Sequence, residues 1–193
     1  MLALLLIGTR GQHFAALNLL PSASWAVFFL AGIYLRPAGQ LPAWLALVWA
    51  LDFVPHLLAG ASLDQIITGQ RAVCLTPAYG FLLAAYSALW FAGRWYARRH
   101  EFRGQTLLPL AAALLLGSLV CELLSSGSFY LLSGYFSEPN VGEFLVRLAT
   151  YFPRSLLTLS FYVAIAALLH GVIATVASLS QGQSQNPNQG NTL

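Results

Sequence analysis

Residues 107–124 read LLPLAAALLLGSLVCELL, a run of eighteen residues with a single charged side chain, Glu122. A helix needs about 20 mostly apolar residues to cross the hydrocarbon core of a bilayer. A helix is also the default spanning element, because each backbone N–H finds its acceptor within the same segment. This stretch therefore predicts a transmembrane helix.

Five further apolar segments flank this one, at residues 1–8, 25–35, 43–58, 78–95 and 144–176. Together the six segments predict an all-α integral membrane protein with six transmembrane helices. We expect residues 1–177 to form a single transmembrane domain. Residues 178–193 are polar and predict a disordered C-terminal tail.

Composition supports a membrane protein and excludes several other classes. Hydrophobic residues make up 58% of the 193 residues and charged residues only 8%, whereas soluble domains carry about a quarter. The net charge is +3 and all the basic residues are dispersed arginines, which does not fit a nucleic-acid partner. The sequence has no Walker loop, and its two cysteines do not make a disulfide framework.

The arginines predict the orientation of the chain. Arg94, Arg98, Arg99 and Arg103 share one short connection, which the positive-inside rule places in the cytoplasm. With six spans, both termini then lie inside. The connection that contains Cys74 lies outside.

Most of the ionisable residues within the apolar segments fall at one level, just below the outer connections. Such residues are costly in a membrane and are functional candidates by default. Only His170 lies in the inner half. The five in the outer half are Asp52, His56, Glu122, Arg147 and Arg154. This clustering predicts a polar cavity open to the outside. The alternative is internal pairing, either of Asp52 with His56 at i, i+4 or of Glu122 with an arginine.

The two cysteines differ in context. Cys121 lies inside an apolar run and is expected to be a buried, small hydrophobic residue. Cys74 lies where an outer connection meets a helix, near Arg71, which favours its thiolate. It can be a nucleophile, a soft-metal ligand or a helix-end residue without a chemical role. The aromatic residues Phe129, Tyr130, Tyr135 and Phe136 of another outer connection can form an interfacial belt or wall a site for a large planar ligand.

Two short stretches carry a resemblance to a known family. They are AVCLTPAYG at residues 72–80, with Cys74 and Tyr79, and GEFLVRLATYFPRS at residues 142–155, with Arg147. The chain resembles the S-components of energy-coupling factor (ECF) vitamin transporters, and more closely the solitary cobalamin-specific S-components of bacteria (BtuM type). The resemblance implies six helices with a substrate pocket formed by the outer loops. It also implies cobalamin binding and uptake across the bacterial cytoplasmic membrane.

The resemblance also implies roles for particular residues. Cys74 would be an axial ligand of the cobalt and would take part in removing cyanide from cyanocobalamin. The remaining residues implied in cobalamin binding are Thr76, Pro77, Tyr79, Arg147, His13, Tyr130 and Tyr135. The partner would be an ECF energising module, whereas a solitary member of the family would need no such module. The segment MLALLLIG is too short to show the small-residue docking motif of that family.

Other classes of function remain open at the level of sequence. Cys74 with His56 or His13 fits a membrane thiol enzyme, which a small electrophile would modify. His13, His56 and Asp52 fit a haem or metal protein. A purely structural membrane protein would bind no ligand and would tolerate Cys74→Ala.

Overall fold

The computed structural model describes residues 1–10, 22–35, 37–58, 60, 77–99, 107–134, 136 and 138–184, and within these ranges it contains helices and no strand. In chain order the elements are α1 (Leu2–Arg10), α2 (Ser24–Tyr34), the short 3₁₀ helix η1 (Ala38–Gln40), α3 (Leu41–Leu58), α5 (Pro77–Ala97), α6 (Leu107–Leu132) and α7 (Val141–Ser184). All six apolar segments of the sequence are helical, which confirms the all-α prediction.

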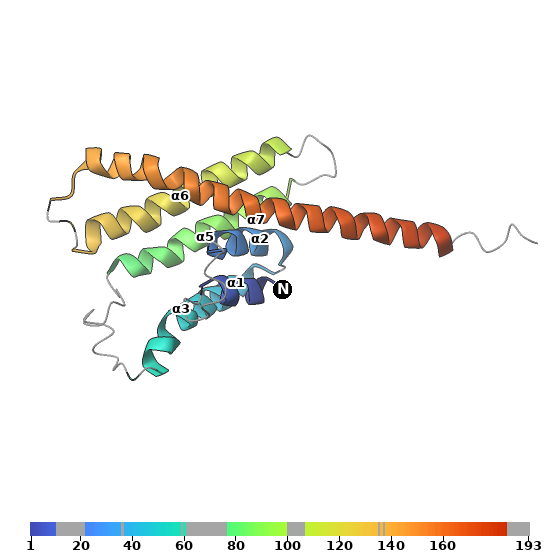
Figure 1. Ribbon diagram of the computed structural model, residues 1–193, viewed down its shortest axis with the longest axis horizontal. Coiled ribbons are helices and arrows are strands. Elements are labelled where there is room, and N and C mark those ends of the chain that lie inside the picture. Colours follow the sequence, from blue (N-terminus) through green and yellow to red (C-terminus); the bar gives the residue numbers. More distant parts are fainter. Residues whose placement is uncertain are drawn as a thin grey trace, which may run out of the picture.

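α2 and α5 occupy the centre of the bundle, with α6 and α7 on one side and α1 and α3 on the other (Figure 1). The side chains of Phe28 and Phe29 on α2, and of Leu89 and Trp90 on α5, are completely buried. Apolar residues cover all sides of α2, which is the pattern of a helix enclosed by others.

Two glycines allow α2 and α5 to approach closely. A Cβ atom at Gly32 would collide with the backbone carbonyl of Trp90, and one at Gly93 with that of Phe29. Small residues at such crossings are the usual means of close helix packing in membranes. The same interface holds the rings of Phe28 and Tyr86 stacked, with centroids 4.6 Å apart.

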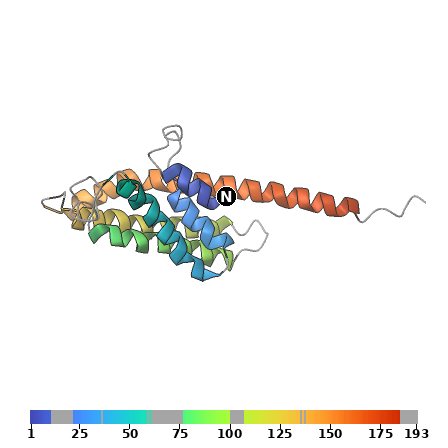
Figure 2. The same cartoon turned by 90° about the horizontal axis from the view of Figure 1, so that it is seen from below.

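α7 is much longer than its neighbours. Its 44 residues correspond to about 66 Å of helix, and its last part extends beyond the other helices (Figures 1 and 2). Exposed apolar side chains continue along that part as far as Leu179.

Two of the described helices, α6 and the part of α7 up to Leu179, are long and apolar enough to cross a membrane. Only 28% and 17% of their most apolar stretches are buried within the protein, so most of that apolar surface faces outward. The all-helical structure is thus compatible with a helical membrane protein. The six spans expected from the sequence are not all present by this measure, because α1 and α2 have 9 and 11 residues and reach only about 14 and 17 Å.

The start of α5, the end of α6 and the start of α7 lie at the same end of the bundle. Ser128 of α6 donates a hydrogen bond to the carbonyl of Ala78 at 3.4 Å, and the rings of Tyr130 and Phe144 are 5.6 Å apart. We call this the α5-start end. At the opposite end, Arg94 donates to the carbonyl of Leu35 at 3.2 Å.

Candidate functional site

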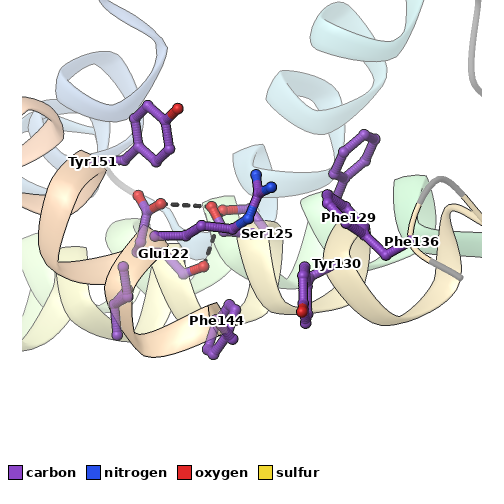
Figure 3. A pocket seen from close by; sticks show the side chains of 10 residues that line it. Glu122, Ser125, Phe129, Tyr130, Phe136, Phe144 and Tyr151 are labelled. Carbon is purple, nitrogen blue, oxygen red and sulfur yellow. Dashed lines mark hydrogen bonds between the residues drawn. The ribbon is translucent and has the colours of Figure 1, made fainter. Parts of the chain in front are cut away.

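A cavity of about 370 Å³ lies between α6 and α7 at the α5-start end (Figure 3). Its walls are largely aromatic, and two serines, one glutamate and one arginine among them can make polar contacts. The lining residues are Glu122, Ser125, Ser126, Phe129, Tyr130, Phe136, Phe144, Arg147, Leu148 and Tyr151. An apolar cavity with a few polar groups is the usual form of a small-molecule site.

Arg147 is held at one edge of this cavity by contacts on two sides. Its guanidinium forms an ion pair with Glu143 at 3.0 Å, and its central carbon lies 4.6 Å from the ring centroid of Phe136. Glu143 in turn accepts a hydrogen bond from the hydroxyl of Tyr130 at 3.2 Å. The arginine remains 43% exposed, so its remaining donors are accessible to a ligand.

Glu122 is the buried carboxylate of the cavity, with 5% of its surface exposed. It accepts a hydrogen bond from the hydroxyl of Ser126 at 2.5 Å. In the described part of the chain it has no cationic partner. The pairing of Glu122 with Arg147 or Arg154, which was the alternative to a polar cavity, does not occur, and Arg147 instead pairs with Glu143 one turn away on its own helix.

A second polar centre joins four helices. Arg10, the last residue of α1, binds Asp52 of α3 through two parallel hydrogen bonds, from Nε to Oδ1 at 2.7 Å and from Nη2 to Oδ2 at 2.6 Å. Its Nη1 donates to Ser24 of α2 at 2.9 Å and to Tyr86 of α5 at 2.6 Å. Tyr79 of α5 donates a short hydrogen bond to Asp52. We call these five residues the Arg10 network.

The Arg10 network changes two expectations. The partner of Asp52 is an arginine from another helix, whereas the sequence suggested His56, whose side chain lies outside the described part. Arg10 itself was not expected to be functional, because it follows a short apolar segment and resembles a loop residue. The available signal was Asp52: a carboxylate within an apolar helix requires a cation or a proton, and Arg10 stands at the end of another apolar segment.

The predicted cobalamin-binding residues are distributed as follows. Tyr130 and Arg147 both line the cavity. Tyr79 is not among the lining residues; its hydroxyl belongs to the Arg10 network and its ring lies edge-on to that of Phe53, with centroids 5.2 Å apart. Pro77 begins α5 at the same end of the bundle. The predicted residues that lie outside the described part are Cys74, Thr76, His13 and Tyr135.

The described ranges contain possible metal ligands and one thiol. No group of three or more His, Cys, Asp or Glu side chains there is arranged to hold a metal ion. Cys121 is a free thiol that is completely buried in α6, as its sequence context predicts.

No protein-family model matches the chain, and no curated protein matches it either.

Proposed function

We propose that the protein binds cobalamin at the α5-start end of the bundle and carries it across the bacterial cytoplasmic membrane. One observation carries this proposal: the aromatic cavity with Arg147 lies at the same end as Pro77, which begins α5 three residues after Cys74 in the sequence. The proposal thus brings a thiol, an aromatic wall and an accessible guanidinium to one ligand.

The chemistry of the cavity suits one edge of a corrin. A corrin is a large, nearly planar ring with amide side chains on its rim. Aromatic walls provide apolar contact for the ring, and Arg147 provides donors for the amide carbonyls. The cavity of about 370 Å³ is smaller than a whole cobalamin, so it would hold part of the ligand.

Cys74 supplies the specificity in this proposal. A thiolate is a soft ligand, and cobalt is a transition metal that accepts such a ligand along its axis. Cobalamin presents an axial position once its benzimidazole base or a water molecule is displaced. Cobalt–thiolate coordination would therefore distinguish cobalamin from organic vitamins that carry no metal.

Tyr79 would support the corrin face as a fixed ring. Its hydroxyl is bound to Asp52 and its ring is in contact with Phe53, so two independent contacts restrict its orientation. Asp52 is in turn bound through both oxygens to Arg10. A side chain fixed in this way loses little conformational entropy when a ligand packs against it.

Removal of cyanide is the chemical step of this proposal. With Cys74 bound to Co(III) on one face, a single electron from an added thiol reductant would convert the cobalt to Co(II); two such thiols, each losing one electron and one proton, would join as a disulfide. The opposite cobalt–carbon bond then breaks, and cyanide leaves as an anion with the bonding electron pair. Cys74 remains the axial ligand. Purified Cys74→Ala protein should release cyanide no faster than free cyanocobalamin, whereas Cys121→Ala should match the parent.

The transport part of the proposal concerns topology. The Cys74 connection would lie outside and the arginine-rich connection inside. It would act with an ECF energising module, or alone as a solitary member of the family it resembles.

Cellular uptake tests the proposal directly. The full chain is expressed in bacteria that lack their own inner-membrane cobalamin importer, and accumulation of radiolabelled cobalamin is followed. We expect uptake with the parent and with Cys121→Ala, and at least about a tenfold loss with Cys74→Ala. Uptake equal to that of empty-vector cells, with the protein present in the membrane, would reject the proposed function.

A further inference from the structure

A second hollow lies on another side of the bundle, between the start of α2, the middle of α5 and α7. It has a volume of about 270 Å³. Its lining carries five hydroxyl groups and one arginine, together with an indole ring. The residues are Ser22, Ser24, Trp25, Tyr86, Arg154, Ser155 and Thr158. We call it the Arg154 groove.

Arg154 has no hydrogen-bond or ion-pair partner in the described part of the chain. Its guanidinium brings a full positive charge to the groove, since arginine does not deprotonate in proteins, and none of its five N–H donors is paired with a described residue. This contrasts with Arg10, which is bound to Asp52, Ser24 and Tyr86, and with Arg147, which is bound to Glu143.

Some hydroxyl groups of the groove also have protons that are not used in the hydrogen bonds described above. The oxygen of Tyr86 accepts a hydrogen bond from Arg10, so the proton of Tyr86 remains free to donate. Ser22 and Ser24 share one hydrogen bond at 3.1 Å, in which either can be the donor. Whichever donates, the hydroxyl proton of the other is left over. Tyr86 is 96% buried, so its direction is fixed by packing.

No negative charge among the described residues that line the groove balances these donors. None of its lining residues is acidic. The nearest carboxylate in the network, Asp52, has both oxygens bound to Arg10 and one also to Tyr79. The groove thus has an excess of donors and of positive charge, which is complementary to an anion rich in acceptors.

The position of Arg154 along α7 indicates its level in a membrane. From residue 155 to the end of the chain the sequence contains no Asp, Glu, Lys or Arg, and its one histidine is His170. Twenty residues after Arg154 span about 30 Å of helix, the thickness of the hydrocarbon core. Arg154 therefore stands where the apolar part of α7 meets the polar headgroup region.

We propose that the Arg154 groove binds a phosphate group at the membrane surface. Its donors come from three helices, α2, α5 and α7, and so surround a tetrahedral anion better than a planar carboxylate. The phosphate can belong to the headgroup of an anionic phospholipid or to a soluble phosphate compound. The groove lies apart from the cavity assigned to cobalamin, and its occupancy does not depend on the proposed function.

Binding is tested on the full chain, purified in a mild detergent, with three probes. These are short-chain phosphatidylglycerol, the matching diacylglycerol without phosphate, and inorganic phosphate, each titrated and followed by native mass spectrometry. We expect phosphatidylglycerol to bind the parent, and Arg154→Gln to weaken it at least about tenfold, because charge-assisted hydrogen bonds to a bound anion are lost. Arg98→Gln, which removes one exposed charge at the opposite end of the bundle, should leave binding unchanged.

Two further variants keep the test decisive if Arg154→Gln does not fold. Arg154→Lys should retain part of the affinity, and Tyr86→Phe should weaken binding while preserving the ring stack. Inorganic phosphate bound as tightly as the lipid would identify a soluble phosphate as the ligand. Diacylglycerol bound as tightly as phosphatidylglycerol, or equal losses in Arg98→Gln and Arg154→Gln, would overturn the proposal.

Discussion

Asp52→Asn is expected to destabilise the helix bundle more than any other single isosteric change in the described part of the chain. The substitution keeps the shape of the side chain but leaves the Arg10 guanidinium without its counter-charge. Arg10 and Asp52 are 13% and 22% exposed, so solvent can compensate only in part. Removing one partner of a buried pair costs about 3–5 kcal/mol. Allowing for this partial exposure and for the acceptor that Asn retains, we expect a loss of about 2–3 kcal/mol.

A double-mutant cycle separates the pair from its surroundings. The variants are Arg10→Gln, Asp52→Asn and both together, unfolded by detergent titration and followed by the fluorescence of the five tryptophans. Because the double variant leaves no unpaired charge, we expect a coupling energy of about 1–2 kcal/mol. The exposed pair Glu143–Arg147 is the matched control, with an expected coupling of about 0.3–0.5 kcal/mol. Additive losses at Arg10 and Asp52 would refute the role assigned to the network.

Three further predictions concern the packing and the cavity. Glu122→Gln should leave the free energy of unfolding within about 1 kcal/mol of the parent or raise it. The change removes a buried carboxylate that has no cationic partner among the described residues, and it keeps an acceptor for the neighbouring serine. Thermal unfolding measures this. Gly93→Ala should lower the free energy of unfolding by about 2–3 kcal/mol, because the new Cβ meets the rigid carbonyl of Phe29. Gly39→Ala is the control and should stay within about 0.5 kcal/mol, because the space around Gly39 is open. Equal effects of the two variants would contradict the close packing of α2 on α5. Arg147→Gln should weaken cobalamin binding by about five- to tenfold in equilibrium dialysis, with Arg147→Lys intermediate, and unchanged affinity would remove Arg147 from the site.

The positions of the helices could be predicted from apolar runs alone. The stretch that begins at Leu107 predicted the start of α6, and the run from 43 to 58 matches α3 within two residues at its start. The end of α6 was placed eight residues too early, because serine and glycine after Leu124 resemble a turn. In the structure this serine-rich part remains helical, since Ser125 and Ser128 bond to carbonyls of their own helix and Ser128 also to α5.

The polar contacts were harder to predict because they depend on which helices are neighbours. The sequence placed Asp52 in an apolar helix but could not show that the end of α1 lies beside it. It also offered the pairing of Glu122 with an arginine of α7 as an alternative. In the structure Arg147 forms its ion pair with Glu143, four residues earlier on the same helix. Tyr130 and Arg147 line the same cavity, since both lie next to the short connection between α6 and α7.

The most direct test of cobalamin binding is the visible absorption spectrum of the protein purified from cells supplied with cobalamin, recorded beside Cys74→Ala and Cys121→Ala. We expect a corrinoid spectrum displaced from that of free cobalamin in the parent and in Cys121→Ala, and a spectrum that reverts or vanishes in Cys74→Ala. A colourless parent protein that also fails to take up added cobalamin would contradict the proposed function, and modification of its Cys74 by a small electrophile would then favour a membrane thiol enzyme.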